Sequence, residues 1–371
     1  MKFKINQKDL YQGIQIVQKA VASKQTMPIL TGIYMEASKD RGIHLIGTDL
    51  ELGIEHTISE AEVINEGSIV IPANNFSNLV RELPKEKINF AADLDNYEIK
   101  IECLNSKFEL KGYDPNEYPQ LPEINIPKKM NIETDKLQNI IKEVEFSTAT
   151  DETQPALTGA LLAVDNENGI TMVSTNTYRL AYSNINITPD IEESIKVILP
   201  GKTLNELNRL LEGDNTEIEI DSNYASFKFN DITVISRLIE GQFPNYQQVM
   251  PNQYNTRVTV DKNKLKKAVK RASLIARMDS NIISLKVSDE RLIINSANSD
   301  TGHAHEEVAV DIEGPEQNIN IDAGYLLDVL KIIDRDEIIL ELIGPLNPLS
   351  LKKTEEERSY TYLIMPVRSD S

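Results

Sequence analysis

The chain has 371 residues and a formal net charge of −19, with 40% hydrophobic and 26% charged residues. This length is too great for one ordinary core, so two or three domains are expected, and the composition is typical of a soluble globular protein. No apolar run approaches the roughly 18 residues of a membrane helix, and the N-terminus has no apolar signal segment. The single cysteine, Cys103, excludes an intrachain disulfide and favours a cytoplasmic location. Cys103 stands in an alternating segment and is expected to be a small core residue.

A unit of roughly 120 residues recurs three times along the chain. Each copy opens with a short strand and a helix whose apolar residues recur at spacings of three and four, which predicts one buried stripe per helix. These helices are predicted over residues 7–24, 135–146 and 261–277. Their stripes are Leu10, Ile14, Val17 and Val21; Leu137, Ile140, Ile141 and Val144; and Leu265, Ala268, Val269 and Ala272.

Strand-like segments follow each of these helices and meet at a polar turn. The same order occurs three times: an apolar strand, a cluster of Ser, Thr, Asn and Asp, and then a second strand. It is found at residues 42–56, 169–183 and 291–305. This pattern indicates three hairpins.

The second half of every unit repeats the strand–helix–strand order. Strands at 67–72, 195–200 and 317–322 lead into helices, and alternating strands come after them. The stripes of these helices are Phe76, Leu79, Val80 and Leu83; Leu204, Leu207, Leu210 and Leu211; and Leu326, Leu327, Leu330 and Ile333.

These elements predict an α+β fold of three tandem domains, each with two helices packed on two antiparallel sheets. The domains are predicted at 1–127, 128–251 and 252–371, and the proline-rich runs 116–129 and 241–254 would connect them. Tandem units leave a sheet edge at either end, and such edges tend to pair. Head-to-tail pairing with a second chain would close a ring of six units. The alternative is that the chain grew by duplication of one domain and does not form a closed ring.

Positive charge is concentrated on the helices although the whole chain is acidic. Residues 261–277 carry seven Lys or Arg against one Asp, and residues 7–24 carry three Lys against one Asp. A ring with helices inside and sheets outside would have a positive bore and an acidic exterior. Such a bore would contact the phosphates of duplex DNA without reading its sequence. A solvated lysine-rich helix without a ligand is the alternative for residues 261–277.

No catalytic or metal site, and no cofactor, is predicted. Gly201-Lys202-Thr203 follows a strand and opens a helix, as the end of a phosphate-binding loop does. Lys196 stands where that loop needs its first glycine, and Pro200 removes a backbone N–H, so an ordinary turn is favoured. His303 and His305 would share one face of a strand without a third ligand. The carboxylates show no spacing that marks an acid–base pair.

Four segments in register over the whole chain resemble the β subunit of bacterial DNA polymerase III, the sliding clamp family. They are TMPIL (26–30), STNTYRLA (174–181), EGQFPNYQQVMP (240–251) and TYLIMPVR (361–368). The resemblance implies a homodimeric, head-to-tail ring that encircles duplex DNA and has no chemistry of its own. Such a ring acts as a processivity factor in DNA replication.

The resemblance also implies a cleft between the second and third domains, in which short linear peptides of the replicative DNA polymerase, the clamp loader and repair polymerases bind. Aliphatic side chains and an adaptable methionine suit the apolar anchors of such peptides, with Arg179 and Arg368 at the rim. Without the resemblance, residues 363–367 would be predicted as an ordinary core strand. The cleft residues would be Leu157, Thr175, Tyr178, Arg179, Leu180, Pro244, Val249, Tyr325, Leu346, Leu363, Ile364, Met365, Pro366, Val367 and Arg368.

Two further surfaces are predicted, one facing DNA and one joining the two chains. Apolar contacts and strand pairing should carry most of the chain–chain association, since surface ion pairs contribute only ~0–1 kcal/mol each. The residues predicted to face DNA are Lys8, Lys19, Lys24, Lys202, Lys264, Lys267, Lys270 and Arg271. In the dimer interface, Phe108 and Leu110 would meet Leu274 and Ile275, with Lys107 facing Asp300 or Glu306.

Two other functions remain open at this point. One is a nucleotide hydrolase built from repeats that uses the turn at Gly201. The other is a scaffold with the same fold and cleft that never encircles DNA.

Overall fold

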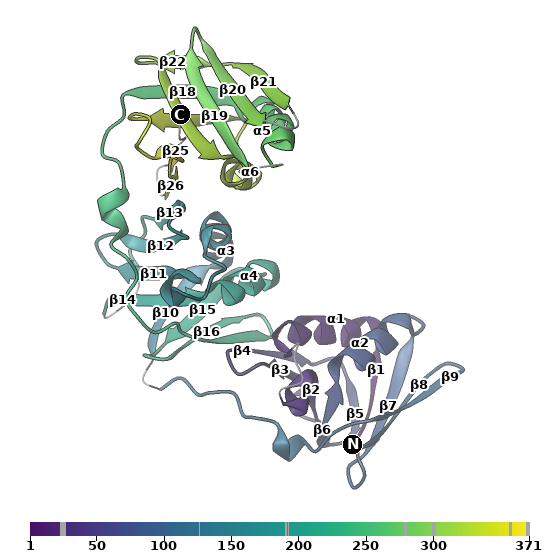
Figure 1. Ribbon diagram of the computed structural model, residues 1–371. Coiled ribbons are helices and arrows are strands. Elements are labelled where there is room, and N and C mark those ends of the chain that lie inside the picture. Colours follow the sequence, from purple (N-terminus) through teal and green to yellow (C-terminus); the bar gives the residue numbers. More distant parts are fainter. Residues whose placement is uncertain are drawn as a thin grey trace. The chain divides into compact units, whose positions relative to one another are not determined.

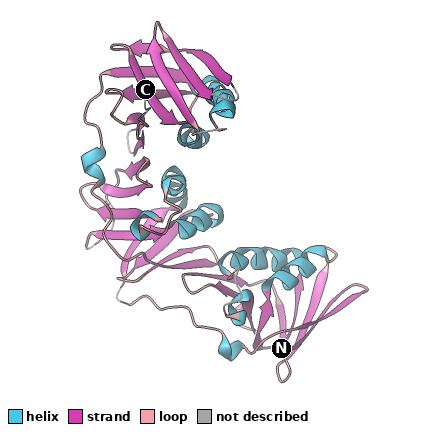
Figure 2. Ribbon diagram, viewed as in Figure 1, coloured by secondary structure: helices cyan, strands magenta, loops and turns pink. Residues whose placement is uncertain are grey.

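The computed structural model describes residues 1–22, 27–125, 127–189, 191, 193–277, 280–298, 302–355 and 358–368. It divides into two compact units, Met1–Leu137 with Glu206–Leu238, and Gln138–Asn205 with Ile239–Ser371. Helices pack against antiparallel sheets, which confirms the predicted α+β class (Figures 1 and 2).

The first unit contains two sheets. The five-stranded sheet has the order β5 (Glu62–Asn65), β1 (Lys2–Asn6), β7 (Lys87–Asp93), β8 (Glu98–Cys103) and β9 (Ser106–Lys111). The eight-stranded sheet has the order β10 (Lys128–Glu133), β15 (Asn215–Ile220), β16 (Tyr224–Phe229), β17 (Ile232–Arg237), β4 (Leu52–Ile58), β3 (Gly42–Thr48), β2 (Gly32–Ser38) and β6 (Gly67–Pro72).

The second unit also contains two sheets. The nine-stranded sheet has the order β14 (Ile195–Pro200), β11 (Gly159–Asp165), β12 (Gly169–Thr175), β13 (Arg179–Ile185), β26 (Arg358–Ile364), β25 (Leu349–Glu355), β24 (Glu337–Leu342), β18 (Thr256–Asp261) and β22 (Asp311–Glu313). The four-stranded sheet has the order β21 (Gly302–Ala309), β20 (Arg291–Asn298), β19 (Ile282–Ser288) and β23 (Gln317–Asp322).

Neighbouring repeats share a sheet, a feature that the sequence did not indicate. β17 pairs with β4, from Ile232 opposite His56 to Ser236 opposite Leu52. β26 pairs with β13 in the same way, from Arg179 opposite Ile364 to Ile185 opposite Arg358. Each of these pairings removes two strand edges that would otherwise be exposed. β9 and β21 remain at the edges of their sheets.

The six predicted helices are all present in the described chain. They are α1 (Gln7–Val17), α2 (Ala73–Glu82), α3 (Thr134–Val144), α4 (Gly201–Leu210), α5 (Lys262–Ala276) and α6 (Ala323–Ile332). Their apolar stripes face the core, as Leu10, Ile14 and Val17 do on α1, which packs on β3 and β4 beside α2. In the second unit, α5 packs on β20 and β21 beside α6 (Figure 1). None of the described helices is long and apolar enough to cross a membrane.

The predicted helix at 7–24 was too long. α1 ends at Val17 and is followed by a 3-10 turn, η1 (Gln18–Ala20). Lys24 and Thr26, the first residue of the TMPIL segment, lie outside the described residues. The other 3-10 turns are η2 (Pro28–Thr31), η3 (Pro115–Glu117), η4 (Glu145–Ser147), η5 (Pro155–Leu157) and η6 (Tyr246–Val249).

The predicted hairpins at 42–56 and 169–183 are confirmed as β3–β4 and β12–β13. β20 and β21 also pair, while residues 299–301 between them lie outside the described part. Cys103 is a buried free thiol on β8, as predicted.

Candidate functional site

A cavity of about 350 Å³ lies where the β12–β13 turn, the start of α6 and the C-terminal segment come together. Its lining includes Tyr178, Tyr325 and residues 365–368, all of which were predicted for the cleft. Ser280, Ile282 and Asp322 also line it and were missed. Ile282 lies opposite Asp322 in the β19–β23 pair, so strand register brings these two residues to the cavity, and register was not predictable from the sequence.

Side-chain hydrogen bonds fix the β12–β13 turn that carries Tyr178. The Thr175 hydroxyl donates to the Arg179 carbonyl (2.7 Å) and accepts from the Thr177 N–H (3.1 Å). The Asn176 Oδ1 accepts from the N–H groups of Tyr178 (3.1 Å) and Arg179 (3.0 Å). Thr and Asn side chains commonly replace backbone hydrogen bonds in turns, so the polar cluster seen in the sequence serves this purpose. As a result, the Tyr178 side chain is held in an exposed position.

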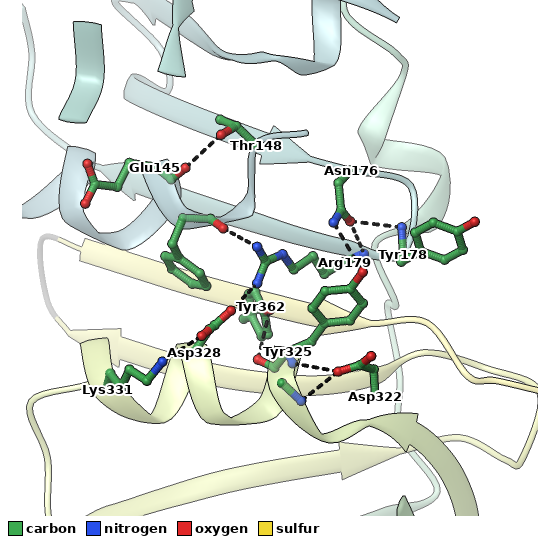
Figure 3. A network of polar contacts seen from close by, with 12 residues as sticks. Glu145, Thr148, Asn176, Tyr178, Arg179, Asp322, Tyr325, Asp328, Lys331 and Tyr362 are labelled. Carbon is green, nitrogen blue, oxygen red and sulfur yellow. Dashed lines mark hydrogen bonds and ion pairs between the residues drawn. The ribbon is translucent and has the colours of Figure 1, made fainter. Parts of the chain in front are cut away.

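Arg179 connects this turn to α6 (Figure 3). Its Nη1 donates to Asp328 Oδ2 (2.7 Å), and its Nη2 donates to the Phe146 carbonyl. The guanidinium carbon lies 4.7 Å from the ring centroid of Tyr325 and 5.5 Å from that of Phe146. Arg179 is only 9% exposed, so it lies behind the cavity surface rather than at an open rim. It supports the Tyr325 wall of the cavity instead.

Backbone hydrogen bonds hold the C-terminal segment along the cavity. The Met365 N–H donates to the Tyr178 carbonyl (2.9 Å), and the Val367 N–H donates to the Asn320 carbonyl (2.8 Å). Arg368 is exposed and lines the cavity, and Ser369 to Ser371 lie outside the described residues. The segment therefore forms one wall of a preformed site.

Asp322 and Tyr362 fix the start of α6, from which Tyr325 projects. Asp322 Oδ1 accepts from the Gly324 N–H (2.6 Å) and from Asn281 Nδ2 (2.7 Å). The Tyr362 hydroxyl donates to the Tyr325 carbonyl (3.1 Å), as Figure 3 shows. Burial raises the pKa of Tyr362, so this hydroxyl stays protonated and can donate.

The aliphatic part of the predicted cleft is a buried cluster rather than an open pocket. Leu180 and Leu363 lie opposite each other on β13 and β26, and both are buried together with Leu157. Tyr246 and Met250 pack against this cluster and are partly buried. Predicted residues outside the cavity lining include Pro244, Val249 and Leu346, which are exposed, and Thr175 and Ile364, which are buried.

Most of the lysines predicted to face DNA are exposed. They are Lys8 on α1, Lys19 on η1, Lys202 on α4, and Lys264, Lys267 and Lys270 on α5. Asp261 caps α5 by accepting from the Lys264 N–H (2.7 Å). Arg271 differs, because it forms two hydrogen bonds with the carboxylate of Glu306 on β21 (2.8 and 2.5 Å). This ion pair offsets the positive charge of Arg271. It also engages the carboxylate of Glu306, a residue that was predicted for the dimer interface.

The described residues predicted to join two chains lie on the edge strands β9 and β21 and on α5. Phe108 is exposed and Leu110 partly buried on the edge strand β9, and Leu274 is exposed and Ile275 partly buried on α5. Lys107 binds Glu102 of the neighbouring strand (2.8 Å), and Asp300 lies outside the described residues.

The geometry at Gly201 does not favour a phosphate-binding loop. The Gly201 N–H donates to the Thr158 carbonyl (3.0 Å), so this donor is already occupied. His305 binds Asn295 Oδ1 through its Nδ1 (2.7 Å). Within the described ranges, no group of three or more His, Cys, Asp or Glu side chains could hold a metal ion.

Comparisons with known proteins agree with the three repeats. Family models of the DNA polymerase III beta subunit match its N-terminal domain at residues 1–122, its central domain at 131–245 and its C-terminal domain at 247–368. Proteins named beta sliding clamp from Staphylococcus aureus and Staphylococcus epidermidis are 33% and 34% identical, over 100% of both chains in each case.

Solved structures give the same result. The DNA polymerase sliding clamp of Bacillus subtilis has a TM-score of 0.92 and 33% identity, and covers 100% of this chain and 99% of its own. The beta subunit from the DNA polymerase of Streptococcus pyogenes has a TM-score of 0.93 and 26% identity, covering 100% of both chains. This chain belongs to the DNA polymerase III beta subunit family, the family of the bacterial sliding clamps.

Proposed function

We propose that two copies of this chain form a head-to-tail ring that encircles duplex DNA and tethers the replicative DNA polymerase to it. The observation that carries this proposal is that the three family domains together span residues 1 to 368. The ring would contain six domains, with boundaries in each chain at 1–127, 128–251 and 252–371. It would act in the cytoplasm as a non-catalytic processivity factor.

Two edge strands support closure of the ring. β9 ends the five-stranded sheet and β21 ends the four-stranded sheet, so each has unpaired backbone groups. Pairing β9 of one chain with β21 of the other would satisfy these groups and bury Phe108 against Leu274. The Arg271–Glu306 ion pair would hold β21 against α5 at this edge.

The exposed Lys8 on α1 and the exposed lysines of α5 support contact with DNA. Lys264, Lys267 and Lys270 are exposed on α5 and would attract phosphates without reading bases. Because a closed ring stays on the duplex by enclosing it, this attraction can be weak and still allow sliding. Tethering then keeps a bound polymerase at a high effective concentration near its substrate.

The cavity beside Tyr178 and Tyr325 supports the binding of short linear peptides. Two aromatic walls and the side chain of Met365 can hold an apolar anchor, and the exposed Arg368 can bind polar atoms at the mouth. A second anchor would reach the cluster at Leu180 by displacing Met250, which is partly buried and unbranched. The replicative polymerase, the clamp loader and repair polymerases would bind this site in turn.

Deleting residues 365–371 tests the assignment of this cleft. The deletion removes one wall of the cavity and both hydrogen bonds of the C-terminal segment, but it leaves β9, β21 and α5 intact. We expect loss of polymerase stimulation on primed circular DNA, with the dimer unchanged in light scattering. A chain lacking only residues 369–371 is the matched control and should stimulate normally. Normal stimulation by the longer deletion would show that the cleft lies elsewhere.

A further inference from the structure

The β3–β4 turn repeats the hydrogen bonds of the β12–β13 turn. The Thr48 hydroxyl donates to the Leu52 carbonyl (3.0 Å) and accepts from the Leu50 N–H (3.0 Å). Asp49 Oδ1 accepts from the N–H groups of Glu51 (3.1 Å) and Leu52 (2.8 Å). Leu50 has a φ of 78° and Thr177 a φ of 74°. Thr48 to Leu52 are therefore equivalent to Thr175 to Arg179.

The strands that pair next to the two turns are also equivalent. β17 pairs with β4 beside the first turn, and β26 pairs with β13 beside the second. The Arg237 N–H donates to the Glu51 carbonyl (2.8 Å), as the Met365 N–H donates to the Tyr178 carbonyl (2.9 Å). Gly53 lies opposite Ile235, where the second unit has Leu180 opposite Leu363. The site where β4 meets β17 is thus an internal copy of the proposed partner site.

A cavity of about 270 Å³ lies at this copy, lined by Leu50, Gly53, Leu121, Tyr224 and Ile235 among others. Leu121 belongs to the proline-rich run 116–129 that was predicted to connect the first two domains, and its side chain covers Gly53. A Cβ atom on Gly53 would lie 2.6 Å from Leu121 Cδ2, so no larger residue fits there while Leu121 keeps its place. Leu180 stands at the equivalent position of the second unit, where Tyr246 and Met250 of the second proline-rich run pack against its buried cluster.

Both ends of the segment are held in place. The Tyr118 ring is buried, and its hydroxyl accepts from the Thr48 N–H (3.2 Å) and lies 3.3 Å from the Gly32 carbonyl oxygen. At the other end, the Asn125 N–H donates to Asp221 Oδ2 (3.1 Å). Leu121, between these anchors, is therefore positioned over Gly53 as the side chain of a bound peptide would be.

We propose that the place where β4 meets β17 is a second peptide site, and that residues 120–122 of the same chain occupy the part of it over Gly53 and line the cavity that remains. Its ligand class is an extended segment with one leucine anchor. The equivalence to a partner site rests on the proposed function, whereas the seating of Leu121 rests only on the contacts above. Occupation from within the chain would leave one site per chain for partner proteins.

Removing the internal ligand should make the site available to the same segment added as a separate peptide. The probe is a fluorescein-labelled peptide of residues 117–125, titrated into the full-length chain by fluorescence anisotropy. Leu121→Ala should bind one more peptide per chain than the wild type does. At the first-unit cavity, its affinity for the peptide should be roughly tenfold or more higher than that of the wild type. Leu104→Ala, which shortens an exposed leucine of the same unit, should behave as the wild type. A peptide with Ala in place of the leucine should not occupy the new site.

Equal stoichiometry for Leu121→Ala and the wild type would overturn the proposal. If Leu121→Ala does not fold, Gly53→Ala provides a second test, because its methyl group would displace Leu121. Cleavage after the exposed Glu123 by a glutamate-specific protease should then be roughly tenfold faster than in the wild type, and an unchanged rate would contradict the proposal. Neither assay involves DNA or a polymerase, so failure here is distinguishable from failure of the proposed function.

Discussion

The Arg179 side chain reaches from β13 to α6 and is almost fully buried, although arginine is seldom buried unless it is paired. Burial acts to lower its pKa, but the neighbouring Tyr362 and Asp328 more than offset this and raise the pKa above its usual value. Resemblance to the family placed Arg179 in the cleft but could not show its orientation. Its partner Asp328 is 149 residues away in the chain, and no local pattern links the two.

Substituting Arg179 should lower the free energy of unfolding of the second unit more than substituting Lys331, an exposed partner of Asp328. Arg179→Ala leaves the Phe146 carbonyl without this donor and Asp328 without its buried cation, so we expect a loss of about 2–4 kcal/mol. Lys331→Ala removes an exposed ion pair with the same Asp328 (2.9 Å) and should cost at most about 1 kcal/mol. Thermal unfolding followed by circular dichroism compares the two variants. Equal melting temperatures would mean that Arg179 has no supporting role.

Helices and strands of this chain were predictable because their signals are local. The stripe of Leu10, Ile14 and Val17 identifies α1 within a few residues, and the polar cluster at 174–177 identifies a turn. The sharing of sheets was not predictable, since β4 and β17 lie far apart in sequence and many strands alternate in the same way. Ile282 and Asp322 were missed for the same reason, because only strand register brings them to the cavity, and Ser280 lies in the turn just before β19.

The two edges of the five-stranded sheet offer a matched test of ring closure. Phe108 on β9 is 40% exposed and Ile64 on the opposite edge strand, β5, is 37% exposed. Phe108→Asp should produce monomers, because the proposed interface would bury a charge without a partner. Leu274→Asp should do the same from the α5 side. Ile64→Asp introduces the same charge at the other edge and should leave the dimer intact in light scattering. Dimers in all three variants would place the interface elsewhere.

At the scale of the whole molecule, a net charge of −19 is compatible with DNA as a partner only if positive charge is concentrated where DNA passes. Positive charge is concentrated on α5, whose exposed lysines would line the hole of the proposed ring, and the described strands and loops carry most of the acidic residues. In the proposed ring, long residence on DNA comes from enclosure rather than from affinity. The ring can therefore slide freely while its bound polymerase stays close to the primer end.

Retention on circular and linear DNA tests enclosure most directly. The wild-type chain is loaded onto nicked circular DNA by the clamp loader of its host, and the complex is separated from free protein by gel filtration. We predict that the protein stays with the circular DNA at a salt concentration that abolishes ordinary phosphate binding, and that it leaves once a single cut makes the DNA linear. Protein that remains on the linear DNA to the same extent would contradict the proposed ring.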